Sequence, residues 1–417
     1  MYRNSILMIL VIAGLWYSAA NGQHVKTYGN YFFRHRAYRQ SLFNPGDIMQ
    51  KYKGVQDRAR LYLNLYTEAG YRLGNVYVQA DVLAGAEGME TWDSHLLFPQ
   101  IFIDIDFENL VVTAGRAIHH WGTGYAFNPT DVIAPEKDVG DPENSQRTAI
   151  GIDMIKAEYF GGSWSAGVCA MGSVTRDNGL HVKSPRVALR IYKTVWDADF
   201  SCIALISADE KPVWGINCAT VFGDRLEVHG ELAWYVGSRR TFHRALFDDF
   251  SLYETAPFTR RAGSKDKCAD WVAGFQYTIS KNALVIGEWF HHDGMSGNQW
   301  DRFTDYGVWL REQLSGPYSE PAEYNLLWCA KAYSQSGAMQ DYIMTTFHYT
   351  LENRLHARAT MFVNTSDASF IAMPYLSYTV KNTLSLYVRG FIFKGADNTE
   401  FGEFFQSFYV EGGIRVL

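Results

Sequence analysis

Apolar and polar residues alternate with a period of two along most of the chain, which is the pattern of β-strands whose two faces meet different surroundings. The segment 225–236 reads RLEVHGELAWYV, with apolar residues at positions 226, 228, 232, 234 and 236 and polar residues at 227, 229 and 231. Residues 58–65, 101–108 and 354–361 alternate in the same way. The pattern predicts a protein built almost entirely from half-buried strands.

The number and length of these segments indicate a transmembrane β-barrel rather than a soluble sandwich. About eighteen segments of roughly 9–14 residues follow one another without a domain break, and that length suits a tilted crossing of a bilayer. Backbone groups in lipid need hydrogen-bond partners within the protein, so such a sheet must close on itself. We therefore predict an all-β fold, a closed antiparallel barrel of about 18 strands, with 16 as the alternative.

Short and long links between the expected strands alternate, as the periplasmic turns and surface loops of outer-membrane barrels do. We expect short links at 69–70, 108–109, 161–162, 195–197, 223–224, 281–282, 351–353 and 381–382. We expect long links at 38–56, 85–96, 119–147, 173–183, 238–268 and 293–338, and shorter outer links at 208–211 and 365–367. With residues 27–37 as a first strand and 320–335 within a loop, the strand number is even and both termini face the periplasm.

The amino-terminal residues 1–22 have the features of a secretory signal peptide: one positive charge at Arg3, an apolar run, and small residues before the expected cleavage site. Residues 23–417 would then form one barrel domain in the bacterial outer membrane, in contact with its lipid. Aromatic residues make up 15% of the chain and the net charge is −6, so nothing favours binding of nucleic acid. The oligomeric state stays open.

The segment 119–135, HHWGTGYAFNPTDVIAP, follows an expected strand and contains glycine, proline and polar residues typical of a fixed bend. Asp131 is placed to accept backbone N–H groups and hold that bend. Trp121 belongs either to this bend or to an aromatic girdle at the membrane surface.

The segment resembles a pattern in porin-like outer-membrane barrels of Gram-negative bacteria, an uncharacterised branch of that superfamily. The shared features are Gly115-Arg116, Trp121-Gly122, Asn128-Pro129, Asp131 and Pro135. The resemblance implies a passive channel for small hydrophilic solutes whose third surface loop, 119–147, folds inward and narrows the pore.

Barrels of a capsule-assembly family also carry a Trp-Gly segment after a glycine-rich strand, so the alternative is a surface polysaccharide assembly or export barrel that acts as a binding scaffold. The last expected strand, residues 403–416, resembles the carboxyl-terminal strand that the barrel assembly machinery reads in outer-membrane proteins. That family usually ends in Phe or Trp, whereas this chain ends in Leu417.

Polar residues of inward parity, together with the loop, supply the candidate pore residues. The constriction is expected to involve Arg116, Trp121, Asp131, Glu136, Asp138, Arg186, Arg190, Glu227, His229, Glu231, Arg354 and Arg358. The loop acids would face Arg116, Arg186 and Arg190 and set up a field that favours dipolar or zwitterionic solutes. A lumen with both signs of charge is consistent with a weakly selective pore or with an ion-paired plug.

Catalysis, a metal and a cofactor are not expected. The pairs His119-His120 and His291-His292 lie at strand ends, where adjacent side chains point to opposite sides and offer one inward ligand at most. His229 between Glu227 and Glu231 is the arrangement nearest to a barrel hydrolase, but a polar stripe that lines the lumen explains these residues more simply. The five cysteines are read as small apolar fillers, with a Cys268–Cys329 disulfide left open.

Overall fold

A computed structural model describes most of the expected barrel. The described residues are 24–38, 41–43, 58–88, 92–134, 149–172, 174–175, 181–182, 185–208, 211–237, 242–259, 267–333, 337–381, 383–403 and 406–416. The proposed signal peptide, 1–22, lies outside them and stays a prediction.

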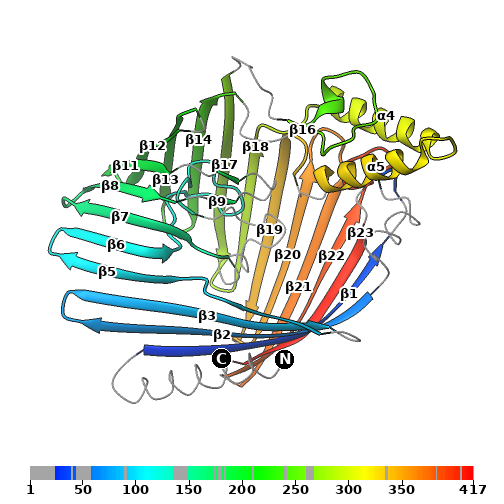
Figure 1. Ribbon diagram of the computed structural model, residues 1–417. Helices are drawn as coiled ribbons and strands as arrows, with labels where there is room; N and C mark the ends of the chain where they lie inside the picture. The colour runs from blue at the N-terminus through cyan, green and yellow to red at the C-terminus, as the bar shows by residue number, and fades with distance from the viewer. Residues whose placement is uncertain are drawn as a thin grey trace.

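The described strands form one closed antiparallel barrel (Figure 1). Its strands are β1 (His24–Tyr38), β2 (Arg58–Leu73), β3 (Val76–Gly88), β4 (Trp92–Leu97), β5 (Ile101–Phe107), β6 (Leu110–Ala117), β7 (Ile152–Phe160), β8 (Trp164–Met171), β11 (Arg186–Val195), β12 (Ala198–Ser207), β13 (Val213–Phe222), β14 (Leu226–Val236), β17 (Lys267–Ser280), β18 (Ala283–His291), β19 (Asp341–Leu351), β20 (Leu355–Asn364), β21 (Phe370–Lys381), β22 (Leu384–Lys394) and β23 (Gln406–Val416). The sheet has 19 strand segments, but β4 and β5 pair end to end with β3 and make one strand of an 18-stranded barrel.

The barrel closes where its first and last strands meet. β1 pairs with β23 from Gly29 opposite Val416 to Tyr38 opposite Gln406. β1 pairs on its other side with β2, so both neighbours satisfy its backbone groups. The predictions of a closed barrel and of 18 rather than 16 strands are therefore confirmed.

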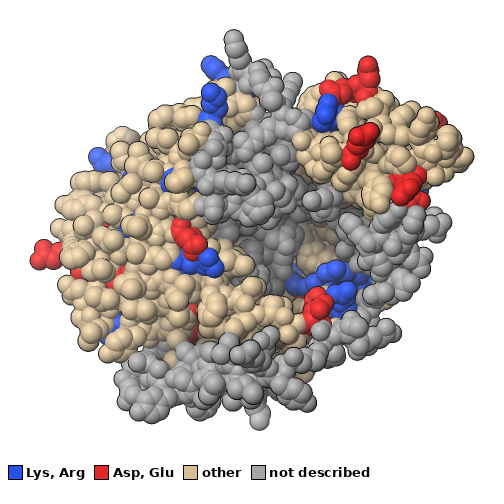
Figure 2. Space-filling view, in the orientation of Figure 1, with Lys and Arg blue, Asp and Glu red and all other residues tan. Residues whose placement is uncertain are grey.

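Each strand has an exposed outer face and a covered inner face. In β14, Val228 and Trp234 are exposed, whereas His229 and Glu231 between them are 5% and 4% exposed. The alternation of apolar and polar residues in the sequence thus corresponds to the outside and the inside of the barrel. A broad, mostly uncharged outer surface is visible in Figure 2.

One end of the barrel, the short-turn end, carries tight connections. Val195 pairs with Ala198 across a turn in which Trp196 and Asp197 both have positive φ, 51° and 63°. This backbone matches the twist of two hairpin strands. The first residue of β1 and the last of β23 lie at the same end, because His24 is opposite Gly70, and Val416 is opposite Leu384.

Two expected link positions are wrong. The first turn lies after Leu73 and not at 69–70, because β2 runs on through Gly70, where an added Cβ would come 2.4 Å from the Tyr77 hydroxyl. The expected link 85–96 is mostly strand, and Gly85 leaves room for the His95 ring. Both glycines mark close side-chain packing across strands rather than turns.

The other end, the long-link end, carries two helices, α4 (Gly297–Gln313) and α5 (Ser319–Tyr333), which lie at the upper right of Figure 1. Its links also hold β9 (Val174–Thr175), β10 (His181–Val182), β15 (Phe242–His243), η1 (Arg244–Leu246) and β16 (Phe258–Thr259). Neither described helix is long and apolar enough to cross a membrane.

The helices are held by an apolar cluster at the mouth of the barrel. Trp300, Phe303 and Leu310 of α4 are buried together with Tyr342 and Phe362, which come from the long-link ends of β19 and β20. The exposed face of the helices carries carboxylates, seen as red atoms in Figure 2. Burial of this apolar face, at about 25 cal/mol per Å², docks the helices on the barrel.

The link after β22 anchors the same cluster through a buried carboxyl. Glu400 accepts hydrogen bonds from the Tyr342 hydroxyl (2.8 Å), the Ala338 amide (2.7 Å) and the Asn364 side chain (2.7 Å). In addition, Trp300 Nε1 donates to the carbonyl oxygen of Asn398 (2.6 Å). The link, the helix and the strand ends therefore form one unit.

The effect of an arginine substitution on the free energy of unfolding should depend strongly on whether the residue lies on the outer or the inner face of the barrel. Leu232→Arg places a charge on the outer row and should reduce the free energy of unfolding by about 2–4 kcal/mol if the row faces lipid. Gln276→Arg, on the inner face of the adjacent β17, is the matched control and should cost much less. Unfolding in urea, after refolding into lipid bilayers, measures both; equal losses would contradict a lipid-facing row.

Glu400 predicts a pH dependence of the cluster at the mouth. Burial, with a contribution from Asp367, raises the pKa of Glu400 from 4.5 to about 7. The folded state binds the Glu400 proton more tightly than the unfolded state does. The stabilisation of the folded state by this proton is therefore complete below pH 4.5 and is lost as the pH rises through 7.

Hydrogen exchange of residues 395–403, corrected for intrinsic exchange rates, should show less protection at pH 8 than at pH 5.5. Glu400→Gln should remove most of this difference. An unchanged pH dependence in that variant would show that another group is responsible.

Candidate functional site: the lumen and its inward loop

The link after β6 turns into the barrel, where two carboxylates on the lumen wall hold its backbone. Glu231 of β14 accepts hydrogen bonds from the backbone N–H groups of Thr123, Gly124 (2.8 Å) and Thr130 (3.0 Å). Glu288 of β18 is the second anchor. We call residues 118–134 the inward loop.

Glu288 holds the middle of the inward loop in the same way. It accepts from the backbone N–H groups of Tyr125 and Ala126, the latter at 2.9 Å. His229 Nε2 lies 2.9 Å from the same carboxylate. Buried hydrogen bonds to a charged acceptor contribute about 1.5–3 kcal/mol each, so several on one carboxylate fix the loop strongly.

The Asn-Pro-x-Asp segment organises the bend itself. Asn128 Nδ2 donates to the carbonyl oxygen of Gly124 (2.6 Å). Asp131 accepts from the backbone N–H of Trp121 (2.8 Å) and contacts His120 Nδ1 (2.6 Å). The prediction that Asp131 accepts a backbone N–H and holds the bend is confirmed.

An apolar contact completes the seating of the inward loop. Trp121, Val132 and Ile133 are buried against inward residues of β5–β14, and Trp121 is only 3% exposed. The guanidinium of Arg190 lies 5.9 Å from the Trp121 ring centroid. Trp121 thus belongs to the bend, not to a girdle on the outer surface.

Two expected pore residues lie elsewhere. Arg116 is on the outer face, because it pairs across β5 and β6 with exposed Ile101, and it forms an ion pair with Asp153 (2.8 Å). The inward assignment of Arg116 was wrong, because Arg116 lies on the same face of β6 as exposed Ala114, whereas Thr113 and Ala117 are buried on the inner face. Arg354 is exposed in a short turn and not on the wall of the lumen.

The remaining expected residues are placed as follows. Arg186, Arg190, Glu227, His229, Glu231 and Arg358 have inward register, and Glu136 and Asp138 lie outside the described residues. Arg190 is 3.7 Å from Glu158, whose other neighbour is Lys156 at 3.2 Å. Among the described residues, Arg116 pairs with Asp153 of β7 rather than with a loop acid. Arg190 pairs with the wall acid Glu158 and also interacts electrostatically with Asp131 of the inward loop.

His229 lies beside the carboxylates that hold the inward loop. Its Nε2 faces Glu288, its Nδ1 is 3.9 Å from Glu227, and Glu231 is engaged by backbone N–H groups. In the pair His291-His292, the ring of His292 stacks on that of Tyr342 with their centroids 5.6 Å apart, and His291 Nδ1 lies 2.8 Å from Oδ1 of Asp341. Cys268 and Cys329 are both free thiols.

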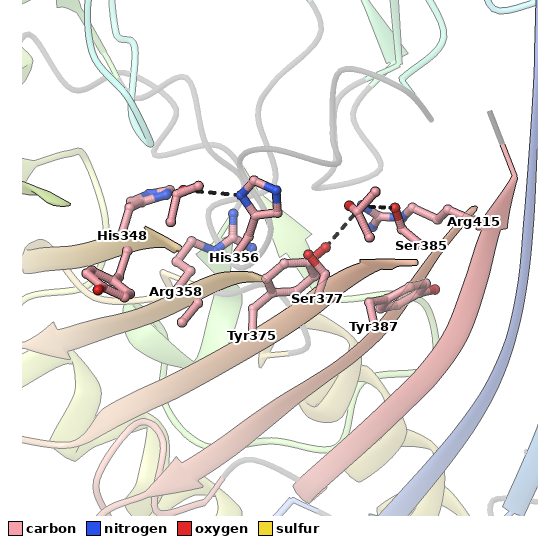
Figure 3. A pocket seen from close by; sticks show the side chains of 12 residues that line it. His348, His356, Arg358, Tyr375, Ser377, Ser385, Tyr387 and Arg415 are labelled. Atoms are coloured by element: carbon pink, nitrogen blue, oxygen red, sulfur yellow. Dashed lines mark hydrogen bonds between the residues drawn. The ribbon is translucent and has the colours of Figure 1, made fainter. Parts of the chain in front are cut away.

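Beside the inward loop, the wall formed by β19–β23 has a hollow of about 290 Å³, shown in Figure 3. We call it the wall hollow. It is lined by His348, Tyr349, Thr350, His356, Ala357, Arg358, Tyr375, Ser377, Thr379, Ser385, Tyr387 and Arg415. His348 meets the ring of Tyr125 edge-on at 6.5 Å, so the hollow adjoins the inward loop.

Other lumen charges are paired along the wall. Glu411 of β23 binds Arg34 (2.7 Å) and Arg389 (2.9 Å), and Arg72 binds Asp106 (2.8 Å). Such pairs join neighbouring strands and lie along the wall rather than across the lumen. Arg358 and Arg415 of β20 and β23 line the wall hollow in addition to these pairs.

Two features were missed by reading parity alone. Neither the anchoring role of Glu288 nor that of Tyr125 follows from strand parity. The only available signal was the run of small and polar residues around Tyr125, which leaves backbone N–H groups accessible. The carboxylates that receive these groups lie more than 100 residues away in the chain.

Solved structures of outer-membrane proteins share this architecture. OccK11 (OpdR) of Pseudomonas aeruginosa superposes with a TM-score of 0.56 at 10% identity, covering 95% of this chain and 96% of that one. The chain has a porin-like barrel fold. OccAB1 of Acinetobacter baumannii gives the same TM-score, identity and coverage, and OccAB2 gives 0.53 at 12% identity, covering 95% of this chain and 98% of that one.

No protein-family model matches the chain, and no curated protein matches its sequence. The likeness of this porin-like barrel to solved structures therefore concerns the fold alone, and the Trp-Gly and Asn-Pro-x-Asp resemblance stays a prediction.

The anchoring of the inward loop by Glu231 predicts faster amide exchange in the loop when this carboxylate is removed. In Glu231→Gln, hydrogen exchange at Thr123, Gly124 and Thr130 should be faster by roughly 10–100-fold, because each amide loses a charged acceptor. Glu227→Gln, a wall position that holds no described loop amide, should leave these rates near those of the parent. If both variants exchange alike, Glu231 does not anchor the loop.

Proposed function

We propose that the porin-like barrel is an outer-membrane channel for passive passage of small hydrophilic solutes. The observation that carries the proposal is the seating of the inward loop on Glu231 and Glu288. A loop held in this way occupies part of the lumen, and the polar wall hollow lies beside it. In this proposal the solute passes along that hollow. No catalytic step or cofactor enters the proposal.

In this proposal, the exposed outer rows of the strands face outer-membrane lipid, and the long-link end faces the cell exterior. The short-turn end and both barrel termini then face the periplasm, in keeping with short periplasmic turns in outer-membrane barrels. Insertion by the barrel assembly machinery follows from the same placement.

The likeness to OccK11 and OccAB1 supports the barrel as the scaffold of a channel, and the polar lining of the wall supports water-filled passage. The channel is selective by the charges that remain accessible on its wall. Because several acids are engaged by the loop or by arginines, the accessible wall around β19–β23 favours solutes with a negative group.

Single-channel recording of the refolded chain in planar bilayers tests the channel. The parent should show discrete, ohmic openings, and a variant lacking residues 123–133 should conduct severalfold more, because it lacks most of the described lumen segment. A matched variant that lacks residues 174–175, in another long link, should keep the parental conductance.

Heat-modifiable gel migration confirms that each variant is folded. Absence of any conductance from folded parent protein would contradict the channel proposal and favour the polysaccharide-binding scaffold. Equal conductance in the parent and in the 123–133 deletion would show that the inward loop does not narrow the passage.

A further inference from the structure

We propose that the wall hollow is a binding site for small phosphorylated solutes, in particular phosphomonoesters that carry hydroxyl groups. This inference rests on the proposed channel function and names a class of solute for it. The site combines an excess of positive charge, arginines held in place by aromatic rings, and a set of hydroxyl groups (Figure 3).

The charge of the hollow has one sign. Arg358 and Arg415 line it together with His348 and His356, and its twelve described lining residues include no Asp or Glu. The nearest described carboxylate in the hydrogen-bond network is Glu411, which is bound to Arg34 and Arg389 and also accepts from the Tyr387 hydroxyl (2.9 Å). An anion in the hollow thus meets two arginines and a carboxylate that is already neutralised.

Aromatic rings set the positions of the two arginines. The guanidinium of Arg358 lies 5.1 Å from the Tyr375 ring centroid, and that of Arg415 lies 4.5 Å from the Tyr387 ring centroid. Arg415 Nη1 also donates to the Tyr375 hydroxyl (3.2 Å). Because the guanidinium groups are ordered in advance, less conformational entropy is lost when an anion binds.

The number of donors favours phosphate over a single carboxylate. A phosphomonoester has three terminal acceptor oxygens and a charge between −1.5 and −2 near neutral pH, by the same reasoning that applies to phosphorylated side chains. Two guanidinium groups and two imidazoles can approach it from several strands. A monocarboxylate has two oxygens and one charge, and so would leave part of this donor set unused.

The hydroxyl groups suit the rest of such a solute. Thr379 and Ser385 lie 3.1 Å apart by their hydroxyl oxygens, and Thr350 is 3.2 Å from His356 Nδ1. Ser377 adds a third strand position to this polar edge. Hydroxyls both donate and accept, so they can exchange hydrogen bonds with the hydroxyl groups of a polyol phosphate.

The place of the hollow also suits a transported solute. His348 contacts Tyr125, and the N–H of Tyr125 is held by Glu288, so the hollow lies directly beside the fixed part of the inward loop. A solute that passes the loop on this side passes the hollow and the two arginines that line it. Binding there would concentrate the solute where the passage is narrowed.

Titration calorimetry of the folded full chain in detergent, with glycerol 3-phosphate, acetate and glycerol as probes, tests the site without requiring conduction. Glycerol 3-phosphate should bind at least tenfold more tightly than acetate, and glycerol should show no measurable binding. The double variant Arg358→Gln/Arg415→Gln should lose at least tenfold in affinity for glycerol 3-phosphate, whereas Arg72→Gln, whose guanidinium pairs with Asp106, should not.

Arg358→Lys keeps the positive charge but removes the planar, forked guanidinium group. It should lose less affinity for glycerol 3-phosphate than Arg358→Gln. Inorganic phosphate serves as a second probe, and affinity for it close to that of glycerol 3-phosphate would overturn a role for the hydroxyl groups. Equal affinity for acetate and glycerol 3-phosphate, or no binding of either, would overturn the phosphate site.

Single-channel recording with the same probes distinguishes failure of the site from failure of the channel. Brief interruptions of current by glycerol 3-phosphate, reduced in the double variant, support both. A conducting channel without binding overturns the site alone, and binding without conduction overturns the channel while the site stands.

Discussion

The pairing of β1 with β23 is the contact on which the rest of the structure depends. An open sheet of this size would leave two rows of backbone N–H and C=O groups without partners, which is costly wherever water is absent. The ten paired positions from Gly29 to Tyr38 remove both edges at once. Closure also separates a lumen from the outer surface. Only in the closed barrel do the two alternating faces of each strand correspond to the lumen and the surroundings.

Once an inside exists, any segment that enters it must find partners for its own backbone. The inward loop has no strand neighbour, so Glu231 and Glu288 supply acceptors for its N–H groups. The same contacts supply hydrogen-bond donors to two carboxylates that would be costly to bury alone. The wall acids thus accept hydrogen bonds from a loop that has no regular secondary structure. Glu231 and Glu288 have inward parity like pore charges, but they hold the loop in place.

This exchange divides the lumen into unlike sectors. On the side of β5–β14, Trp121, Val132 and Ile133 pack into an apolar cluster, and a second cluster under α4 lies at the mouth. On the side of β19–β23 the wall keeps Arg358, Arg415 and hydroxyl groups around a hollow. The described lining of the hollow includes two arginines and no acid, and Glu411 beside it is bound to Arg34 and Arg389.

The sequence by itself determined the barrel, the parity of most strands and the presence of a bend at Asp131, because strand alternation and turn chemistry are local properties. It also indicated that the third long link differs from the others. It misplaced Arg116, since the face of a strand end depends on its register with Ile101 across β5 and β6. It misread Gly70 and Gly85 as links, because only the paired strands show Tyr77 and His95 packed over them.

The tertiary structure alone decided which charges stay accessible. Glu231 and Arg358 have the same inward parity, yet one receives loop amides and the other lines the hollow. The sequence cannot distinguish them, because the partners of Glu231 come from a segment about a hundred residues away that must first fold into the closed barrel. The face on which a strand residue lies follows from its neighbours in the sequence. The group that a lumen side chain contacts depends on which distant segments lie next to it in the closed barrel.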